Sequence, residues 1–197
     1  MMQTTFRAAS SLLALCLLAS IPTFAHAQAA APAKPAPGTV LQPSQELDKI
    51  LSGIEKEFVP LAEAMPEDKF EFAPTVAGGD FKGVRTFAGQ IKHVTEANVL
   101  FFAEPPLSPA EFKAKREAIE KLTTRADILQ AFKDSFKTAH AFMAGTTPEN
   151  AWQALPNGRS RAGMAAYAMQ HMMDHYGQLV VYLRMNGIIP PASRGNM

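Results

Sequence analysis

Three histidines are the residues best suited to carry chemistry in this sequence: His93, His171 and His175. His171 and His175 are four residues apart, which on an ideal helix leaves their side chains about 40° apart on one face, one turn above the other. Two imidazoles placed in this way can share one metal ion. Such a pair also arises by chance, so the surrounding residues decide how it is interpreted.

The neighbours of these histidines favour a site over simple packing. A packing stripe on the last helix would consist of Leu, Val and Ile, whereas the face of His171 and His175 also carries a thioether, an amide and two phenols, from Met164, Gln178, Tyr167 and Tyr182. His93 shares its face with Gly89 and Ala97, one turn to either side. These small residues leave room for an ion and a substrate.

Three neutral imidazoles with open coordination positions suit zinc, nickel, iron or manganese, and catalytic zinc sites typically combine three protein ligands with a water molecule. We therefore predict one divalent metal ion, with zinc or nickel as the first choice, bound by His93, His171 and His175. An open site of this kind implies chemistry or ligand exchange. The alternative for His93 is a core histidine that donates to a backbone carbonyl.

Other polar residues are candidates for roles around the ion. Asp174 points about 60° away from His171, and Glu96 points away from His93 by the same angle, so either carboxylate could orient a ligand or accept a proton. Tyr182 is a third candidate for moving protons, and the spacing does not choose among the three. Solvated helix charges are the alternative for both carboxylates.

Gln178 is expected near the metal site, whereas His140 is expected away from it. Gln178 lies one turn beyond His175 and can hydrogen-bond a metal ligand or a bound water, which makes it a candidate for support of the site. His140 lies on no polar stripe that connects it with the other three histidines. We expect it at the surface or at the boundary of the core.

The elements that position these residues are helices, because apolar residues recur at helical spacing and no stretch alternates at a strand period. Ser44 is expected to cap the first helix, and Gly187 to close the last in the left-handed conformation. The architecture is therefore all-α, a four-helix bundle with a short additional helix. The expected long helices are Ser44 to Pro66, Val84 to Ala103, Thr124 to Gly145 and Ser160 to Asn186, and the short one is Pro109 to Leu122.

The amino-terminal sequence has the pattern of a secretory signal peptide over residues 1–27. Arg7 precedes a short apolar run, and small residues end at Ala27. Residues 28–43 are rich in Ala and Pro and predict a flexible, disordered linker, which leaves residues 44–193 as one domain. The protein is thus expected to be exported, either periplasmic or secreted, with no stable membrane anchor after cleavage because the apolar run is too short to span a bilayer.

The composition after cleavage at Ala27 excludes several functions. Cys16 and Arg7 leave with the signal, so 18 basic residues face 18 acidic ones, from totals of 19 and 18 in the whole chain. The mature chain then has no disulfide, catalytic thiol or thiolate ligand. Its near-zero net charge favours neither nucleic acid nor an anionic membrane as a partner.

Three stretches of the chain resemble the DinB-like (DinB/YfiT) superfamily. They are residues 90–98 (QIKHVTEAN), residues 171–179 (HMMDHYGQL) and residues 182–191 (YLRMNGIIPP). The resemblance covers roughly Ser44 to Ser193. It implies a four-helix bundle with a three-histidine divalent metal site, matched here by His93, His171 and His175, and frequently a homodimer.

The better understood members of that superfamily are thiol-dependent transferases and isomerases, and others are described as metal-dependent hydrolases. The resemblance therefore implies a metal-dependent enzyme, a hydrolase or a thiol-dependent transferase, with an unidentified small-molecule substrate. Hydrolysis is the natural expectation for an exported protein, because small thiols are scarcer outside the cytoplasm. The alternatives are a non-catalytic protein that binds a metal or small ligand, and a bundle in which the histidines only pack.

Overall fold

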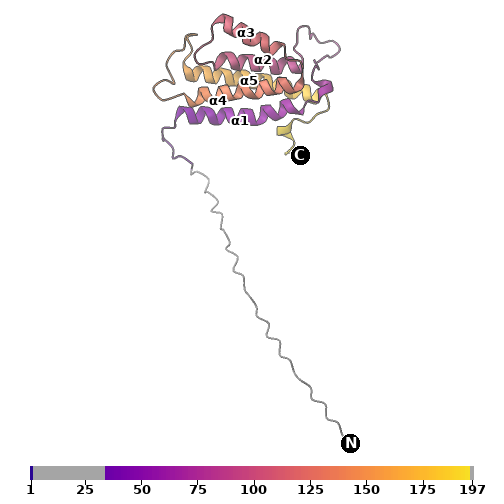
Figure 1. Cartoon of the computed structure of the whole chain (residues 1–197), viewed down its shortest axis with the longest axis horizontal. Helices are drawn as coiled ribbons and strands as arrows, with labels where there is room; N and C mark the ends of the chain where they lie inside the picture. Colours follow the sequence, from indigo (N-terminus) through magenta and orange to yellow (C-terminus); the bar gives the residue numbers. More distant parts are fainter. Residues whose placement is uncertain (2–33, 196–197) are drawn as a thin grey trace. The chain divides into compact units, whose positions relative to one another are not determined.

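The computed structural model describes Met1 and residues 34–195, and within these residues the chain forms five α-helices. Within those residues there is no β-strand, so the expected all-α class is confirmed. The signal peptide expected at residues 1–27 and the linker up to residue 33 lie outside the described residues, apart from Met1. The helices are α1 (Pro43–Ala64), α2 (Phe87–Phe101), α3 (Pro109–Glu120), α4 (Arg125–Ala144) and α5 (Arg161–Met185) (Figure 1).

The four long helices pack as a bundle, as the sequence predicts. The main contacts of α1 are with α4 and α5, and those of α2 are with the same two helices, so that α1 and α2 occupy diagonal positions. The short helix α3 packs against α2 on the outside of the bundle (Figure 1). This order makes α2 and α5 direct neighbours, and these two helices carry the three histidines.

The largest fully buried side chains of the core between the helices are phenylalanines. The rings of Phe58 on α1 and Phe132 on α4 meet edge to face, with centroids 5.0 Å apart. Burial of each such side chain contributes about 1.5–3 kcal/mol relative to leaving it exposed. The aromatic residues that are fully buried are Phe58, Phe87, Phe102, Phe132, Phe136 and Phe142.

Two expected helix starts are wrong. The helix predicted from Val84 begins instead at Phe87, because the Thr86 hydroxyl accepts a hydrogen bond from the Gly89 amide at 3.0 Å and so caps it. It ends at Phe101, two residues before the predicted Ala103. Ser44 does not cap α1: the helix already begins at Pro43, a residue suited to the first helical position because its missing N–H would have no partner there.

The crossing segment between α1 and α2 contributes to the start of α2. The amides of Phe87 and Ala88 donate to the carbonyls of Phe72 and Phe70, at 2.8 and 2.9 Å. First-turn amides of a helix have no acceptor within the helix, so these two bonds satisfy groups that would otherwise need water. At the same end of the bundle, Gly187 has a φ of +72°, as predicted for the residue that closes the last helix.

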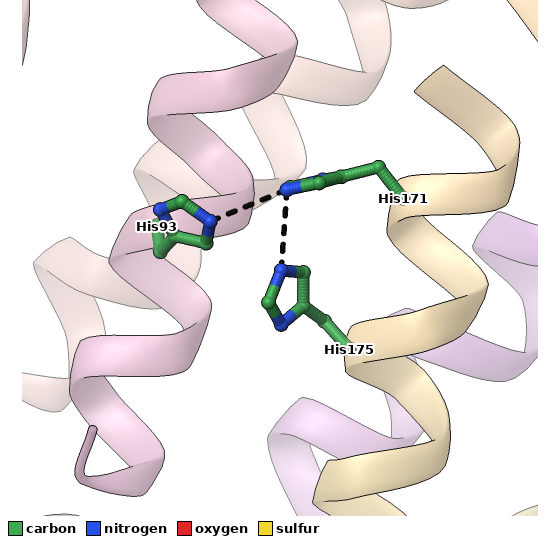
Figure 2. A group of neighbouring side chains, drawn as sticks. All are labelled: His93, His171 and His175. Atoms are coloured by element: carbon green, nitrogen blue, oxygen red, sulfur yellow. Dashed lines mark hydrogen bonds between the residues drawn. The ribbon is translucent and has the colours of Figure 1, made fainter. Parts of the chain in front are cut away.

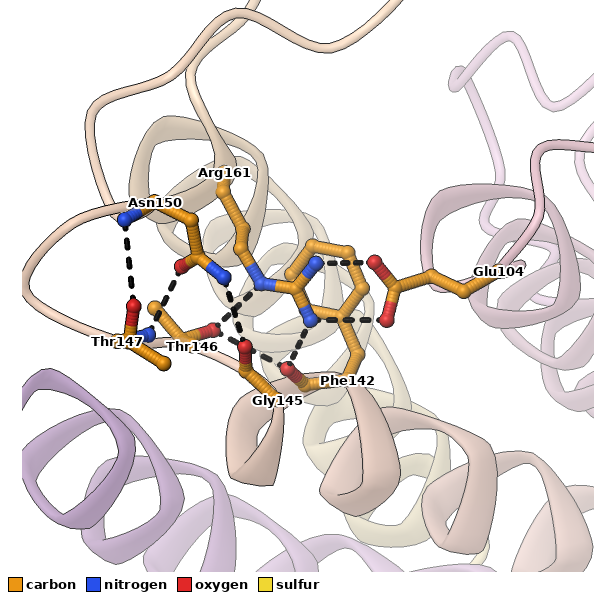
Figure 3. A network of polar contacts seen from close by, with 7 residues as sticks. All are labelled: Glu104, Phe142, Gly145, Thr146, Thr147, Asn150 and Arg161. Carbon is orange, nitrogen blue, oxygen red and sulfur yellow. Dashed lines mark hydrogen bonds and ion pairs between the residues drawn. The ribbon is translucent and has the colours of Figure 1, made fainter.

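A buried arginine holds the amino-terminal end of α5 against two other parts of the fold (Figure 3). The two terminal nitrogens of Arg161 pair with the two carboxylate oxygens of Glu104, in the loop after α2. Its Nε donates to the Thr146 hydroxyl at 2.9 Å, and Nη2 donates to the Phe142 carbonyl at 2.7 Å. The guanidinium also lies 4.1 Å from the centroid of the Phe142 ring. We call this set of contacts the Arg161 clamp.

His140 on α4 has partners that the sequence analysis did not identify. Its Nδ1 lies 2.6 Å from an oxygen of Asp48 and its Nε2 lies 2.9 Å from an oxygen of Glu55, both on α1. The side chain is 29% exposed, which agrees with the expected boundary position. This histidine therefore joins α1 to α4 and takes no part in the three-histidine cluster.

The segment before the bundle is described from residue 34. The Thr39 amide donates to the Ala36 carbonyl at 3.1 Å, and Gly38 supplies the positive φ of +86° that this turn contains. Among the described helices, none is both long and apolar enough to cross a bilayer.

Candidate metal centre

The three predicted ligands come together between α2 and α5 (Figure 2). Nε2 of His171 lies 3.2 Å from Nε2 of His93 and 3.1 Å from Nε2 of His175. One donor atom from each residue can be chosen so that all three lie within 4.8 Å of one another. The convergence across 78 residues of sequence, from His93 to His171, is a result of the packing of α2 on α5.

These spacings fit the donor set of a transition-metal site. Ligand nitrogens lie 2.0–2.1 Å from zinc, and in a tetrahedral arrangement two of them are separated by about 3.3 Å. The two Nε2–Nε2 distances of 3.2 and 3.1 Å are close to that separation. The cluster could therefore hold one divalent metal ion, and imidazole as the donor suits zinc, nickel, copper or iron.

Hydrogen bonding among the histidines does not by itself explain this arrangement. A ring nitrogen of neutral histidine carries either one proton or one lone pair, so Nε2 of His171 cannot form two well-aligned bonds to its two neighbours. Nδ1 of His171 and Nδ1 of His175 are both buried and have no protein hydrogen-bond partner. Because Nε2 of His171 cannot pair fully with both neighbouring rings, the three converging Nε2 atoms are suited to a shared external cation.

The electrostatics keep the histidines in the form that binds metals. Burial lowers the pKa of His93 to about 4, and the charges of Arg85 and the other two histidines act in the same direction. Burial also lowers the pKa of His175 to about 4, with the His171 charge as the next cause. For His171 burial again lowers the pKa, although the Asp174 carboxylate opposes the shift. All three rings are thus neutral near pH 7, with a lone pair available to a cation.

A cleft of about 710 Å³ opens beside the cluster and gives a small molecule access to it. His93 and His171 lie in its wall, together with Gly89 and Ala97, the small residues on either side of His93. The expectation of space around His93 is therefore confirmed. We call this opening the polar cleft, because five charged side chains also line it: Arg85, Lys92, Glu96, Arg116 and Glu120.

The three candidates for proton transfer have different positions. Glu96 lines the polar cleft, and burial, followed by the charge of Glu120, raises the pKa of its carboxyl group. Asp174 is exposed and accepts a hydrogen bond from Gln178 at 3.3 Å. Tyr182 is buried and donates its hydroxyl to the backbone carbonyl of Arg85 at 3.0 Å, so that its proton is already engaged.

Gln178 links the two helices that carry the histidines. Its Oε1 accepts a hydrogen bond of 2.7 Å from Nε2 of Gln90, a buried residue of α2. The structure therefore places this amide beside the cluster, where it fixes the approach of α5 to α2.

Most residues that line the polar cleft were not predicted from the sequence. The short helix α3, expected only as an addition to the bundle, contributes Phe112, Arg116 and Glu120 to the wall opposite the histidines. Their spacing of four residues was a usable signal, since it places all three on one helical face. Arg85 lies just before the Thr86 cap, outside any periodic segment, and no comparable pattern marks it.

Comparison with known sequences places the cluster in a family context. The family model of the DinB superfamily matches residues 51–179, about two thirds of the chain. All three histidines of the cluster lie inside the matched segment. No curated protein matches the chain.

Proposed function

This chain belongs to the DinB superfamily, and on that premise we propose that it is a metal-dependent enzyme that hydrolyses a small molecule. His93, His171 and His175 would hold one divalent ion, with zinc or nickel as the first choice. The observation that carries the proposal is the convergence of three Nε2 atoms beside an open cleft. When bound, the ion would supply Lewis acidity, which lowers the pKa of a water or thiol ligand and polarises a carbonyl group.

The residues of the chain supply binding and proton transfer. Glu96 is the candidate we favour for proton transfer, because it lines the polar cleft and its raised pKa lets the carboxyl group hold a proton closer to neutral pH. Arg85 places a positive charge at the same cleft, where it would attract an anionic or strongly polar group. Phe101 contacts the His171 ring edge to face, at 5.7 Å between centroids, and adds an aromatic surface to the cleft beside it.

We also propose that the protein acts after export. The support is the signal-peptide pattern of residues 1–27, with small residues ending at Ala27. Export would place the enzyme where small thiols are scarcer, which favours hydrolysis over thiol transfer. Amino-terminal sequencing of the protein recovered from the periplasm or medium tests this, and a mature chain that still begins at Met1 would contradict it.

Metal analysis of protein purified without an affinity tag tests the metal site. The expected content is about one zinc or nickel ion per chain, falling below roughly 0.2 in His93→Ala. His140→Ala is the matched control, because it removes a histidine outside the cluster, and its metal content should equal that of the wild type. Equal metal content in wild type and His93→Ala would overturn the proposal.

Activity is tested with the metal-loaded protein on esters, amides and pairs of a thiol with an electrophile. Turnover of an ester or amide that His93→Ala abolishes would support hydrolysis. Turnover that requires a thiol would replace hydrolysis by transfer at the same site. Tight ligand binding with no turnover across the panel would identify a binding protein instead.

A further inference from the structure

A second cavity of about 630 Å³ lies next to the polar cleft. Its lining is dominated by apolar side chains from the loop after α2, from α4 and from the start of α5, and we call it the apolar cavity. Few polar groups enter it, a pattern typical of cavities that bind the hydrocarbon part of a ligand. Its apolar lining includes the side chains of Leu107, Phe142, Leu155 and Met164.

The two charged side chains at the apolar cavity contact neighbouring groups of the protein. The Glu104 carboxylate is held by Arg161 in the clamp described above. The Arg159 guanidinium lies 4.1 Å from the centroid of the Tyr167 ring, and the Arg159 amide donates to Asn157 Oδ1 at 3.0 Å. A ligand in this cavity therefore meets mainly hydrocarbon and aromatic surface.

The two cavities share a wall. Leu100, Phe101 and Tyr167 line both of them. The rings of Phe101 and Tyr167 meet edge to face with centroids 5.3 Å apart, and Phe101 also contacts the His171 ring. The two cavities therefore adjoin along these side chains, and a ligand that reached past Phe101 would contact both of them.

The Arg161 clamp makes the apolar cavity a preformed one. Two of the residues that line it, Glu104 and Phe142, are fixed by the same guanidinium, one through its carboxylate and the other through its ring and carbonyl (Figure 3). Bidentate pairing to a planar guanidinium restricts orientation as well as distance. These contacts therefore fix the loop after α2 relative to the end of α4.

From this arrangement we infer that the substrate is amphiphilic, with its reacting polar group at the three-histidine cluster and an acyl or aryl chain in the apolar cavity. This inference rests on the proposed function, since it assigns the substrate class of the same site. The polar cleft alone would favour small hydrophilic substrates. The adjoining apolar cavity instead favours substrates that bind more tightly as their chain grows.

Binding of alkyl hydroxamates to the zinc-loaded protein, measured by calorimetry, tests the inference without any need for turnover. The hydroxamate group is a metal-binding head, and the series from acetohydroxamate to octanohydroxamate lengthens only the chain. Affinity should rise about fourfold for each added methylene, because each one that leaves water contributes a similar increment. The metal-free protein should keep this dependence on chain length at lower overall affinity.

The outcomes separate the inference from the proposed function. If acetohydroxamate binds the zinc-loaded protein and affinity does not increase with chain length, the inference is overturned while the metal site stands. If acetohydroxamate does not bind the zinc-loaded protein, the proposed function fails and the amphiphilic substrate fails with it.

Leu107→Arg locates the chain in the apolar cavity. The substitution places a charge at its wall, and the ratio of octanohydroxamate to acetohydroxamate affinity should fall at least tenfold. Ile50→Arg, at an exposed position of α1 outside both cavities, is the matched control and should leave the ratio unchanged. If Leu107→Arg does not fold, the chain-length series on the wild-type protein still tests whether the site binds an apolar chain. An unchanged ratio in folded Leu107→Arg would overturn the inference.

Discussion

Arg161 and His175 are both buried polar residues of α5, and each meets side chains from other parts of the sequence. Nε and both terminal nitrogens of Arg161 have acceptors, in Glu104, Thr146 and the Phe142 carbonyl. His175 has a buried Nδ1 without a protein hydrogen-bond partner, and its Nε2 faces another ring nitrogen. The clamp is complete within the protein, whereas the histidine cluster is not.

The difference distinguishes a structural network from a binding site. A buried polar group that lacks a partner costs about 1–3 kcal/mol, so its presence requires a compensating use. A complete network instead stabilises one arrangement of the chain. We therefore expect substitutions in the Arg161 clamp to affect stability, and substitutions in the cluster to affect metal binding.

The largest effect on stability is expected for Arg161→Met. The substitution keeps an apolar stem but removes the charge that pairs with Glu104 and two hydrogen bonds, which should lower the free energy of unfolding by about 3 kcal/mol. Urea denaturation of the metal-free protein measures this. Metal content of the folded variant should stay at the wild-type value. Arg159→Met, at an exposed arginine, is the matched control. If Arg161→Met lowers the free energy of unfolding no more than this control does, the clamp is not the structural network described above.

The next effect is stabilisation by the ion. Zinc at a free concentration of 100 times its dissociation constant should raise the free energy of unfolding of the wild type by about 2.7 kcal/mol. His93→Ala should lose this increment, because a ligand is removed, and His140→Ala should retain it. Denaturation with and without zinc measures the difference, and an equal increment in His93→Ala would place the ion elsewhere.

His140 is intermediate between the Arg161 clamp and the histidine cluster. Both of its ring nitrogens have partners, as in the clamp, but its side chain is partly exposed. Burial would lower the pKa of His140, yet the hydrogen bonds that its ring donates to Asp48 and Glu55 outweigh burial and raise the pKa. Because the pKa is higher in the folded protein, protonated His140 stabilises the fold. This stabilisation is complete below the unfolded-state pKa of 6.5 and is lost as pH rises through the folded-state pKa.

The corresponding substitution is His140→Gln, which removes the titrating ring. It should lower the free energy of unfolding by roughly 1 kcal/mol at about pH 5.5, and the loss should shrink as pH increases above 6.5. Urea denaturation across this range measures the effect. A loss that is constant with pH would mean that the charge of His140 does not contribute.

The smallest effect on stability is expected for His175→Leu in the metal-free protein. Leucine replaces a buried ring whose Nδ1 has no partner, so the free energy of unfolding should change by less than about 1 kcal/mol or increase. Leu179→Ala, one turn further along α5 and fully buried, should cost about 2–5 kcal/mol and shows that the assay detects packing losses. A similar loss in His175→Leu would make the cluster a structural one.

The parts of the molecule that sequence could predict depend on local periodicity. The helices follow from apolar residues at helical spacing, and His171 and His175 were paired because four residues make about one turn. The helix starts at Phe87 and Pro43 were missed because capping depends on the backbone conformation at Thr86 and Gln42.

The remaining features depend on contacts between distant segments. Arg161 and Glu104 are 57 residues apart, and His140 and Asp48 are 92 apart, so no local pattern relates them. The pairing of His93 with the other two histidines was expected from the polar character of the helical faces and from the family resemblance. The wall that α3 adds to the cleft depends on how that helix docks on α2.

The separation of His93 and His171 along the chain has a consequence for folding. An ion held by both residues would close a loop of 78 residues that includes all of α3 and α4. Closing a flexible loop of that length costs about 4 kcal/mol of chain entropy, a cost that folding of the bundle meets before the ion binds. The bound ion would then hold α2 against α5, and its loss would weaken the helix interface that forms the site.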